Sequence, residues 1–256
     1  MDTKEFYDQL SPTYYRDTFE DVSNLTAIAR RVRTQTVLDM LKRHVSPASV
    51  VADLGCGPAQ FAEPILESHD KYIGLDISRE MYARTAERLS SNPAASFTEG
   101  SIENIPLASE SVDGVICIGV LEYLPNNAKA FREIHRVLKK GGVAIISFPN
   151  LRYPLFFLRT IIRPIVAPVL RVLVPKLRST VYISGTTHRT MFPGRFLKEA
   201  KQVPFRVLEK STHAYFPLFF NHALPRTMVP LYYKWDQLGK KIAPGMGANY
   251  IVCLQK

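Results

Sequence analysis

The sequence predicts an α/β fold in which a mostly parallel β-sheet carries helices on both faces. Short apolar runs of strand type alternate with amphipathic runs of helical period between residues 48 and 150. This alternation is typical of βαβ units, whose strands lie parallel. A chain of 256 residues suits one large domain with a sizeable elaboration, so we expect a single domain over residues 1–256.

The expected elements follow one another in a regular order. Strand-like runs cover residues 49–55, 71–77, 95–101, the start of 111–124, and 142–150. Helix-like runs cover residues 58–69, 78–91 and 126–142. We expect Ser78 to be the N-cap of the second of these helices, and the Gly141–Gly142 pair to stop the third helix ahead of the fifth strand. Two later strand-like runs, 205–216 and 249–256, would complete the sheet at its far edge.

The first 45 residues have a helical pattern. In "NLTAIARRVRTQTVLDMLKRH" the apolar residues recur at helical spacing with basic residues between them. The segment ahead of this helix, "FYDQLSPTYYRDTFED", is rich in tyrosine, and we expect Pro12 to break it.

Charge and cysteine content bear on the partner of this protein and on its redox environment. Residues 1–150 hold 16 Lys and Arg against 20 Asp and Glu, a net charge of −4, whereas residues 151–256 hold 17 against 3, a net charge of +14. Such asymmetry predicts an anionic partner surface, either nucleic acid or a membrane headgroup layer. The three cysteines have no metal-ligand spacing, so we expect no metal site and a reducing, cytosolic setting. The first ten residues have no signal-peptide pattern.

The turn in "VVADLGCGPAQF" carries the first functional signal. Gly55 and Gly57 directly follow a buried strand, where glycine permits a sharp turn and the close approach of a ligand. Asp76 ends the next strand, where an acid is placed to bind ribose hydroxyls. Gln60 stands where a dinucleotide motif has its third glycine, so an adenosine-containing ligand without phosphates fits better.

Four stretches together resemble the class I S-adenosylmethionine-dependent methyltransferases of the small-molecule and lipid branch. They are "VVADLGCGPAQF", "YIGLDIS", "FTEGSIENIPLASESVDGVICIGVLEYL" and "REIHRVLKKGGVAIISFPN", and they cover roughly residues 48–150 in the family's order. The resemblance implies S-adenosyl-L-methionine as the cofactor. It also implies a Rossmann-like sheet of seven strands with the last strand antiparallel, to which the final two runs would belong.

Carried over by position, the resemblance also implies site residues. The cofactor-binding set would be Asp53, Gly55, Gly57, Asp76, Ile77, Ser101, Ile102 and Ile118. Asp53 and the glycines would line the methionine end, Asp76 would bind the ribose, and Ile77 would pack on the adenine. Ser101 stands where family members commonly have an acid that receives the adenine amino group. In many members an aromatic N-terminal segment folds over the cofactor, so Tyr14 and Tyr15 either form such a lid or pack the first helix onto the sheet.

Methyl transfer needs a general base only when the acceptor must lose a proton. Side chains of the right chemistry for such a base are His188, His213, His222, Glu122 and Tyr123. We single out His188 and Tyr14 as catalytic candidates, and Tyr15, Tyr123, His188 and His222 as substrate-binding candidates. A structural, hydrogen-bonded role is the alternative for each histidine.

Residues 151–178 form a basic and apolar insertion after the fifth strand, with six basic residues, no acid and four prolines. A membrane span is excluded because the longest uncharged run, Pro164–Leu170, has seven residues. Kinked amphipathic helices fit peripheral contact with an anionic membrane, and a cap over the substrate is the alternative. The basic residues are embedded among Leu, Ile, Val and Phe instead of a polar groove with stacking aromatics, which argues against a nucleic-acid partner.

The sequence therefore predicts methyl transfer to a hydrophobic small molecule or lipid at the cytoplasmic membrane face. An isoprenoid, a quinone precursor, a fatty acyl chain and a lipid headgroup are the acceptor classes considered. The expected layout is a lid over 1–45, a cofactor-binding core over 48–150, a helical cap or membrane-facing insertion over 151–200, and final strands with substrate-side elements over 201–256. The alternatives are a soluble enzyme for a polar metabolite, RNA or protein, and a non-catalytic binding protein.

Overall fold

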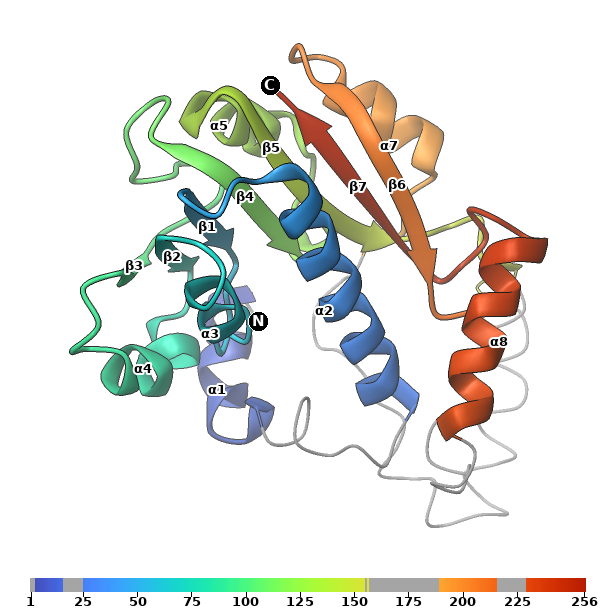
Figure 1. Cartoon of the computed structure of the whole chain (residues 1–256), viewed down its shortest axis with the longest axis horizontal. Coiled ribbons are helices and arrows are strands. Elements are labelled where there is room, and N and C mark those ends of the chain that lie inside the picture. The colour runs from blue at the N-terminus through green and yellow to red at the C-terminus, as the bar shows by residue number, and fades with distance from the viewer. Residues whose placement is uncertain (1–2, 16–24, 155, 157–188, 216–228) are drawn as a thin grey trace.

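A seven-stranded sheet organises the chain, and it confirms the predicted fold class. In the computed structural model, the structure describes residues 3–15, 25–154, 156, 189–215 and 229–256 (Figure 1). The strands are β1 (Val50–Leu54), β2 (Lys71–Asp76), β3 (Ala95–Glu99), β4 (Val112–Ile118), β5 (Leu138–Pro149), β6 (Arg206–His213) and β7 (Asn249–Gln255). Their order in the sheet is β3-β2-β1-β4-β5-β7-β6. Only β7 runs antiparallel to its neighbours, as expected for the last strand.

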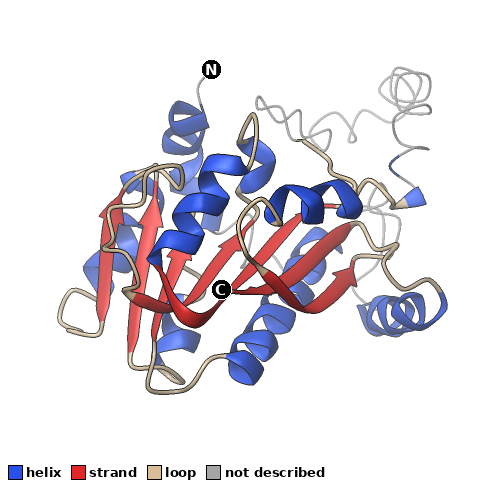
Figure 2. Cartoon of the chain, turned by 90° about the horizontal axis from the view of Figure 1, so that it is seen from above, coloured by secondary structure: helices blue, strands red, loops and turns tan. Residues whose placement is uncertain are grey.

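Helices cover both faces of this sheet, as Figure 2 shows. They are α1 (Thr3–Tyr15), α2 (Leu25–His44), α3 (Ala62–Leu66), α4 (Arg79–Arg88), the short 3-10 helix η2 (Leu121–Tyr123), α5 (Ala128–Val137), α7 (Pro193–Ala200) and α8 (Val229–Ile242). None of the helices in these described parts has both the length and the apolar character that crossing a membrane requires.

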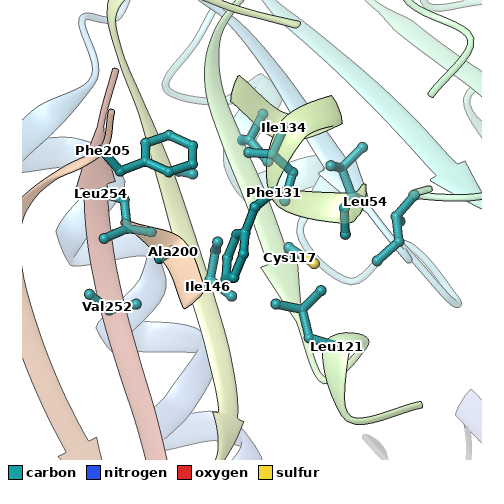
Figure 3. Close-up of a cluster of buried hydrophobic side chains, with 14 of the residues drawn as sticks. Leu54, Cys117, Leu121, Phe131, Ile134, Ile146, Ala200, Phe205, Val252 and Leu254 are labelled. Carbon is teal, nitrogen blue, oxygen red and sulfur yellow. The ribbon is translucent and has the colours of Figure 1, made fainter. Parts of the chain in front are cut away.

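Two apolar cores lie on opposite faces because successive strand residues point to opposite sides. On one face, α5 and α7 contribute Phe131 and Phe196, whose rings lie 5.3 Å apart, and Val252 of β7 packs into the same cluster (Figure 3). On the other face, Leu41 of α2 packs in a cluster with Ile251, the neighbour of Val252. Strands that are buried on both faces read as continuous apolar runs, which explains the pattern of "VVADL".

The carboxyl ends of the parallel strands share one edge of the sheet, and the long connections leave from it. After β5, Asn150 pairs with Met191 in an isolated parallel bridge, and the Leu151 N–H donates to the Met191 carbonyl at 3.0 Å. The chain therefore leaves the sheet and returns to it at one point. Most of the 151–178 insertion lies outside the described residues, but Asn150 before it and Met191 after it both lie at the edge where Gly55 and Asp76 are found.

The prediction that Pro12 breaks the first helix was wrong, because α1 runs through it. Proline has no N–H for the carbonyl one turn earlier, which belongs to Asp8. The Ser11 hydroxyl donates to that carbonyl at 3.1 Å and replaces the missing bond.

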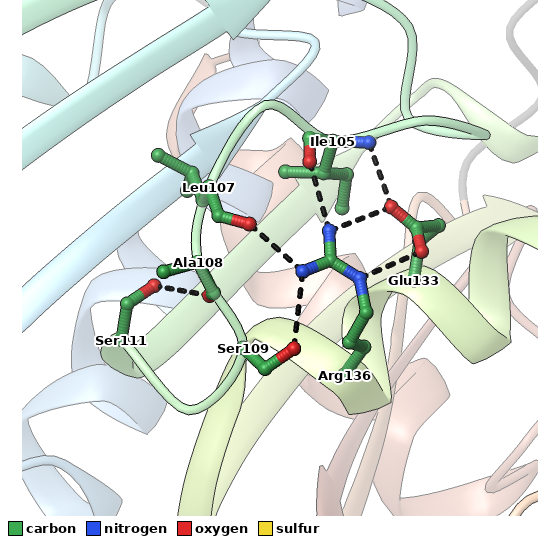
Figure 4. Close-up of polar contacts among 7 residues, drawn as sticks. All are labelled: Ile105, Leu107, Ala108, Ser109, Ser111, Glu133 and Arg136. Carbon is green, nitrogen blue, oxygen red and sulfur yellow. Dashed lines mark hydrogen bonds and ion pairs between the residues drawn. The ribbon is translucent and has the colours of Figure 1, made fainter.

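The predicted boundary before the fifth strand was also wrong. α5 ends at Val137, and Gly141 and Gly142 lie inside β5 instead of stopping the helix. At the end of α5, the carbonyls of Arg136 and Val137 accept from the N–H groups of Glu110 and Ser111 and so find their partners outside the helix. Arg136 also bonds through its side chain. Its guanidinium donates to the carbonyls of Ile105 and Leu107 and to the Glu133 carboxylate, which fixes the loop before β4 (Figure 4).

Candidate functional site

The glycine turn after β1 packs tightly against the neighbouring strand ends. The N–H groups of Gly55 and Cys56 both donate to the Leu75 carbonyl, at 2.7 and 3.0 Å. Gly55 has a φ of +76°, and a Cβ added there would lie 2.2 Å from Cγ2 of Val120. Only glycine fits this position without moving its neighbours.

Asp76 joins the turn to the second strand. Its carboxylate accepts from the Gly57 N–H at 2.7 Å and from the Ser78 N–H at 2.9 Å. Burial raises the pKa of Asp76, and these backbone bonds oppose the shift. Ser78 does stand at the N-cap position of α4, but the expected side-chain cap is absent, because its hydroxyl donates to Asp8 of α1 at 2.5 Å.

Asp53 is a second buried carboxyl group at the same edge. It accepts a hydrogen bond from the Tyr72 hydroxyl at 2.9 Å. Burial raises the pKa of Asp53 to about 7, the Tyr72 bond lowers it, and the charge of Asp76 raises it further. A cationic group brought close to Asp53 would stabilise the ionised form.

The remaining predicted cofactor residues lie around this turn. Ile77 is 39% exposed although it is apolar, whereas Ile102 and Ile118 are buried. The Ser101 hydroxyl accepts from the Glu103 N–H at 3.2 Å, so this side chain is engaged in its own turn. Ile77 thus offers an apolar surface directly after the carboxylate of Asp76.

A cluster of tyrosines connects α1 to η2, which follows β4. The Tyr7 hydroxyl donates to the Tyr123 hydroxyl, and the two rings meet edge to face at 5.7 Å. The Tyr14 ring lies 6.0 Å from that of Tyr7. The structure therefore brings the predicted Tyr14 and Tyr123 together, through a residue that sequence reasoning missed. The side chain of Tyr15 lies outside the described part.

Two charged side chains flank Gly119 beside this cluster. A Cβ on Gly119 would lie 3.6 Å from Nη1 of Arg33 and 3.7 Å from Oε1 of Glu122. Glu122 is buried, and its Oε2 has no hydrogen-bond partner in the described part of the chain. Burial raises the pKa of Glu122 to about 7, against the opposing effect of its own backbone bond and of Arg33. Such a carboxyl group exchanges protons near neutral pH.

His213 lies at the carboxyl end of β6, on the same edge of the sheet. It is fully buried, and neither ring nitrogen has a hydrogen-bond partner among the residues described. Burial lowers the pKa of His213 well below its usual range, and the positive charges of Arg33 and Lys240 lower it further. The imidazole is therefore neutral near pH 7.

The other two candidate histidines, His188 and His222, lie outside the described residues. Arg189, the residue after His188, anchors the returning insertion to the end of β4. Its N–H donates to the Glu122 carbonyl at 2.9 Å, and its guanidinium donates to Oδ1 of Asn127 at 2.8 Å. The sequence analysis did not single out Arg189. The one signal that could have found it is its position directly after the candidate His188.

The sheet order and the glycine turn at its carboxyl edge define a Rossmann-like α/β domain. Residues 52–146 match the family model described as "Methyltransferase domain". The demethylmenaquinone methyltransferase of Desulfitobacterium hafniense is 30% identical over 122 residues, covering 45% of this chain and 46% of that protein. The malonyl-[acyl-carrier protein] O-methyltransferase of Pectobacterium atrosepticum is 35% identical over 103 residues, covering 40% and 38%.

The fold likeness extends over nearly the whole chain. The structure of magnesium protoporphyrin IX methyltransferase from Synechocystis, with bound SAH, matches with a TM-score of 0.64 at 16% identity, covering 99% of this chain and 97% of that one. The chain spans about half or less of the length of the curated relatives it matches. Together with the sheet and the turn, the match over residues 52–146 identifies a methyltransferase domain within this chain, and the likeness to a structure with bound SAH supports S-adenosylmethionine as its cofactor.

The residues at the turn fit this cofactor chemically. Asp53 and Asp76 accept bonds from Tyr72 and from two backbone N–H groups, and the ion pairs of the described residues bring no basic side chain to either. A methionine ammonium group beside Asp53 and ribose hydroxyls beside Asp76 would supply such partners. The exposed side chain of Ile77 provides an apolar face for an adenine ring.

Proposed function

We propose that this chain transfers the methyl group of S-adenosylmethionine to a hydrophobic small molecule or lipid at the cytoplasmic face of a membrane. The observation that carries the proposal is the shared edge of the sheet. The bridge between Asn150 and Met191 returns the basic, apolar insertion to the edge that holds Gly55 and Asp76. A hydrophobic acceptor bound by residues 151–178 would therefore lie beside the methyl donor.

The cofactor supplies an activated methyl group on a sulfonium, and the protein mainly positions the reactants and excludes water. In our proposal Asp76 holds the ribose and Asp53 holds the ammonium group. Glu122 is the best-placed described group to take a proton from an acceptor hydroxyl, since its pKa of about 7 suits a base near neutral pH. His188 and Tyr14 remain proposed catalytic residues, and Tyr15, Tyr123, His188 and His222 proposed contacts to the acceptor.

We further propose that α1 acts as the lid of this site. Asp8 accepts from the Ser78 hydroxyl beside the ribose-binding carboxylate, and Lys4 pairs with Glu99 at 3.2 Å at the end of β3. In this proposal α1 contacts the cofactor side of the site through Asp8, which binds Ser78, and the acceptor side through Tyr7, which binds Tyr123. A helix docked in this way excludes water from both reactants together.

Calorimetric titration with S-adenosylmethionine tests the cofactor half of the proposal. We expect binding by the wild type and its loss in Asp76→Ala. The exposed Asp70, in the loop before β2, gives the matched control Asp70→Ala, which should bind normally. Absence of binding by the wild type, or unchanged binding by Asp76→Ala, would overturn it.

Two further measurements test the acceptor half. Lipid extracts incubated with the protein and deuteromethyl-labelled cofactor should yield a labelled lipid in mass spectrometry. Flotation with anionic vesicles should carry the wild type upward and leave an Arg152→Gln, Arg159→Gln and Arg163→Gln triple variant behind. Failure to float, with cofactor binding intact, would place the reaction in solution.

A polar metabolite is the second candidate acceptor. It is favoured by the buried polar atoms of Glu122 and His213 that have no partner within the described residues. Buried polar groups are normally hydrogen-bonded, so these atoms suit a polar substituent on the acceptor. Labelling of a water-soluble extract, with none of the lipid extract, would support this alternative.

A further inference from the structure

The helix α8 is fixed to the fold by one face. Tyr232 and Asp236 on this face are buried at 1% exposure. Oδ1 of Asp236 accepts from the Ala214 N–H at 2.8 Å, and Oδ2 pairs with Lys240 at 3.1 Å. The helix therefore has a defined orientation beside the carboxyl end of β6, as Figure 1 shows.

A neighbouring face of α8 presents an apolar stripe to solvent. Leu231, Trp235, Leu238 and Ile242 are 48%, 49%, 48% and 72% exposed. Their spacings of four, three and four residues place them on one helical face. Of the large apolar side chains exposed in the described residues, six of nine lie between residues 231 and 246. Such a concentration marks an interaction surface, whereas scattered exposed residues do not.

The charge around this stripe is of one sign. Lys234 and Lys241 are exposed, and their helical positions place both along the same border of the stripe. They also line a shallow hollow next to Leu238. The single acid in the α8 sequence, Asp236, points inward and is already bonded. The outer face of α8 thus combines bulky apolar side chains with positive charge, which is complementary to an anionic lipid surface.

We infer that α8 docks this protein onto anionic lipid, with the stripe in the interface and Lys234 and Lys241 against the phosphate groups. The inference rests on the membrane location in the proposed function, but it does not depend on which acceptor is methylated. It adds a second contact, on residues separate from the 151–178 insertion. The docked face begins where β6 ends, at the edge of the sheet that holds the cofactor site.

The chain contains its own probe, because Trp235 is its single tryptophan. Vesicles of phosphatidylglycerol should shift its emission to shorter wavelength, and bromine-labelled acyl chains should quench it. Vesicles of phosphatidylcholine should bind much more weakly. The shift should shrink as salt rises, because the lysine contribution is screened.

Two α8 variants keep the probe in place. Leu238→Ser with Ile242→Ser should weaken vesicle binding at least tenfold, because two exposed apolar side chains leave the interface. Lys234→Gln with Lys241→Gln should weaken binding to anionic vesicles by roughly fivefold for each lysine and leave the weak binding to phosphatidylcholine unchanged.

A matched control comes from α7 and its two flanking residues, because Phe192 before the helix is 53% exposed, and Lys198 in the helix and Lys201 after it are also exposed. The variant Phe192→Ser, Lys198→Gln, Lys201→Gln should bind vesicles as the wild type does. Equal losses in the α7 and α8 variants, or no change in Trp235 emission with any vesicle, would overturn the inference. A second outcome would also overturn it. Sedimentation could show that the wild type is a dimer through the stripe, that the α8 variants are monomers, and that only these monomers bind lipid.

The failure of this inference can be told apart from failure of the proposed function. If the α8 variants float with vesicles while the arginine variants of residues 152–163 do not, the membrane location holds and α8 docking is wrong. If the α8 variants lose vesicle binding but still methylate an acceptor dispersed in detergent, docking and chemistry are separate properties. Cofactor titration of every variant checks that the fold is intact.

Discussion

The two halves of this molecule build the same edge of the sheet by different means. Residues 1–150 carry a net charge of −4, and here the site consists of tight backbone turns and strand-end carboxylates. Residues 151–256 carry +14 and contribute long connections, the buried His213 and the exposed face of α8. The family match stops at residue 146. In our proposal the first half recognises the cofactor through local backbone geometry, whereas the second half contributes side-chain surfaces that lie outside the family match.

Buried polar groups at this edge differ in how fully the protein satisfies them. In the first half, Asp53 and Asp76 receive hydrogen bonds from the protein itself. Where the halves meet, Glu122 and His213 keep atoms without partners in the described structure. A partly satisfied polar cluster costs stability, so we expect it to be retained for function. The predictions below test this division, from the largest expected effect to the smallest.

Gly55→Ala should cause the largest change, because it breaks the backbone geometry of the first half. The new Cβ would overlap Val120, and φ would stay in the left-handed region. We expect a loss of about 3–5 kcal/mol in the free energy of unfolding and no measurable cofactor binding. The matched control is Gly141→Ala, which has a φ of +79° but nothing within 4 Å of the added Cβ.

Gly141→Ala should cost only about 1 kcal/mol and leave cofactor affinity unchanged. Urea unfolding and calorimetry compare the two variants. Similar losses in both would show that backbone strain alone, and not the contact with Val120, accounts for the Gly55 effect. Val120→Ala should partly restore the stability of Gly55→Ala, since it removes the overlapping methyl group.

Asp53→Asn should raise the free energy of unfolding, whereas most substitutions at buried sites lower it. The folded pKa of Asp53, about 7, lies above the ordinary value of 3.8, so the stabilisation from its protonated form is full at acid pH and is lost as pH rises through 7. Asparagine stays neutral and can still accept from Tyr72. At pH 8 and without cofactor, the variant should therefore be more stable, by up to about 4 kcal/mol.

The same variant should bind S-adenosylmethionine more weakly, because the ammonium group loses its counter-charge. Urea unfolding at pH 4.5 and pH 8, with and without cofactor, measures both effects. Parallel pH profiles for the wild type and Asp53→Asn would contradict the assignment of this ionisation to Asp53.

The sequence predicts the fold well, because continuous apolar runs report burial on both faces of the central strands. Its errors occur where tertiary contacts override local signals. A helical pattern continues past Val137, yet the carbonyls of Arg136 and Val137 bond to the loop before β4, and β5 begins. Nothing in the spacing of Pro12 shows that Ser11 replaces its missing hydrogen bond.

The contacts of the site likewise separate into those that a local motif predicts and those that depend on tertiary packing. Gly57 and Asp76 are 19 residues apart within one βαβ unit, so their contact follows from the motif. Tyr7 and Tyr123 are 116 residues apart, and only the docking of α1 brings them together. Pairings of that kind depend on packing between distant segments, which residue spacing does not encode.

His213→Leu should stabilise the protein, by about 1–2 kcal/mol, because it removes buried nitrogens that have no partner in the described residues. The lowered pKa of His213 means that the wild type loses stability as pH falls below about 6.5, and the variant should not. His69→Leu is the matched control from the first half. Nδ1 of His69 pairs with the Ser68 hydroxyl at 2.9 Å, so its removal should destabilise.

If His213 contacts the acceptor, the stabilised His213→Leu variant should also show slower methyl transfer with normal cofactor affinity. Unfolding and turnover measured on one preparation test both parts. A destabilised His213→Leu would mean that the histidine has a structural partner, and the division between the halves would fail at this residue.

Tyr7→Phe should have the smallest effect on stability, because it removes one hydroxyl from the contact between α1 and η2. A hydrogen bond of this kind contributes about 0.5–1.5 kcal/mol. If α1 is a lid over both reactants, the loss should appear mainly in kcat/KM for the acceptor, as a decrease of roughly three- to tenfold. The affinity for S-adenosylmethionine should change less than twofold, since Asp8 still binds Ser78.

Tyr250→Phe, whose ring stacks on Phe148 in the core, is the control and should leave kcat/KM unchanged. Equal loss of acceptor and cofactor binding in Tyr7→Phe would show that α1 supports the fold as a whole, and that the two halves of the site are coupled through it.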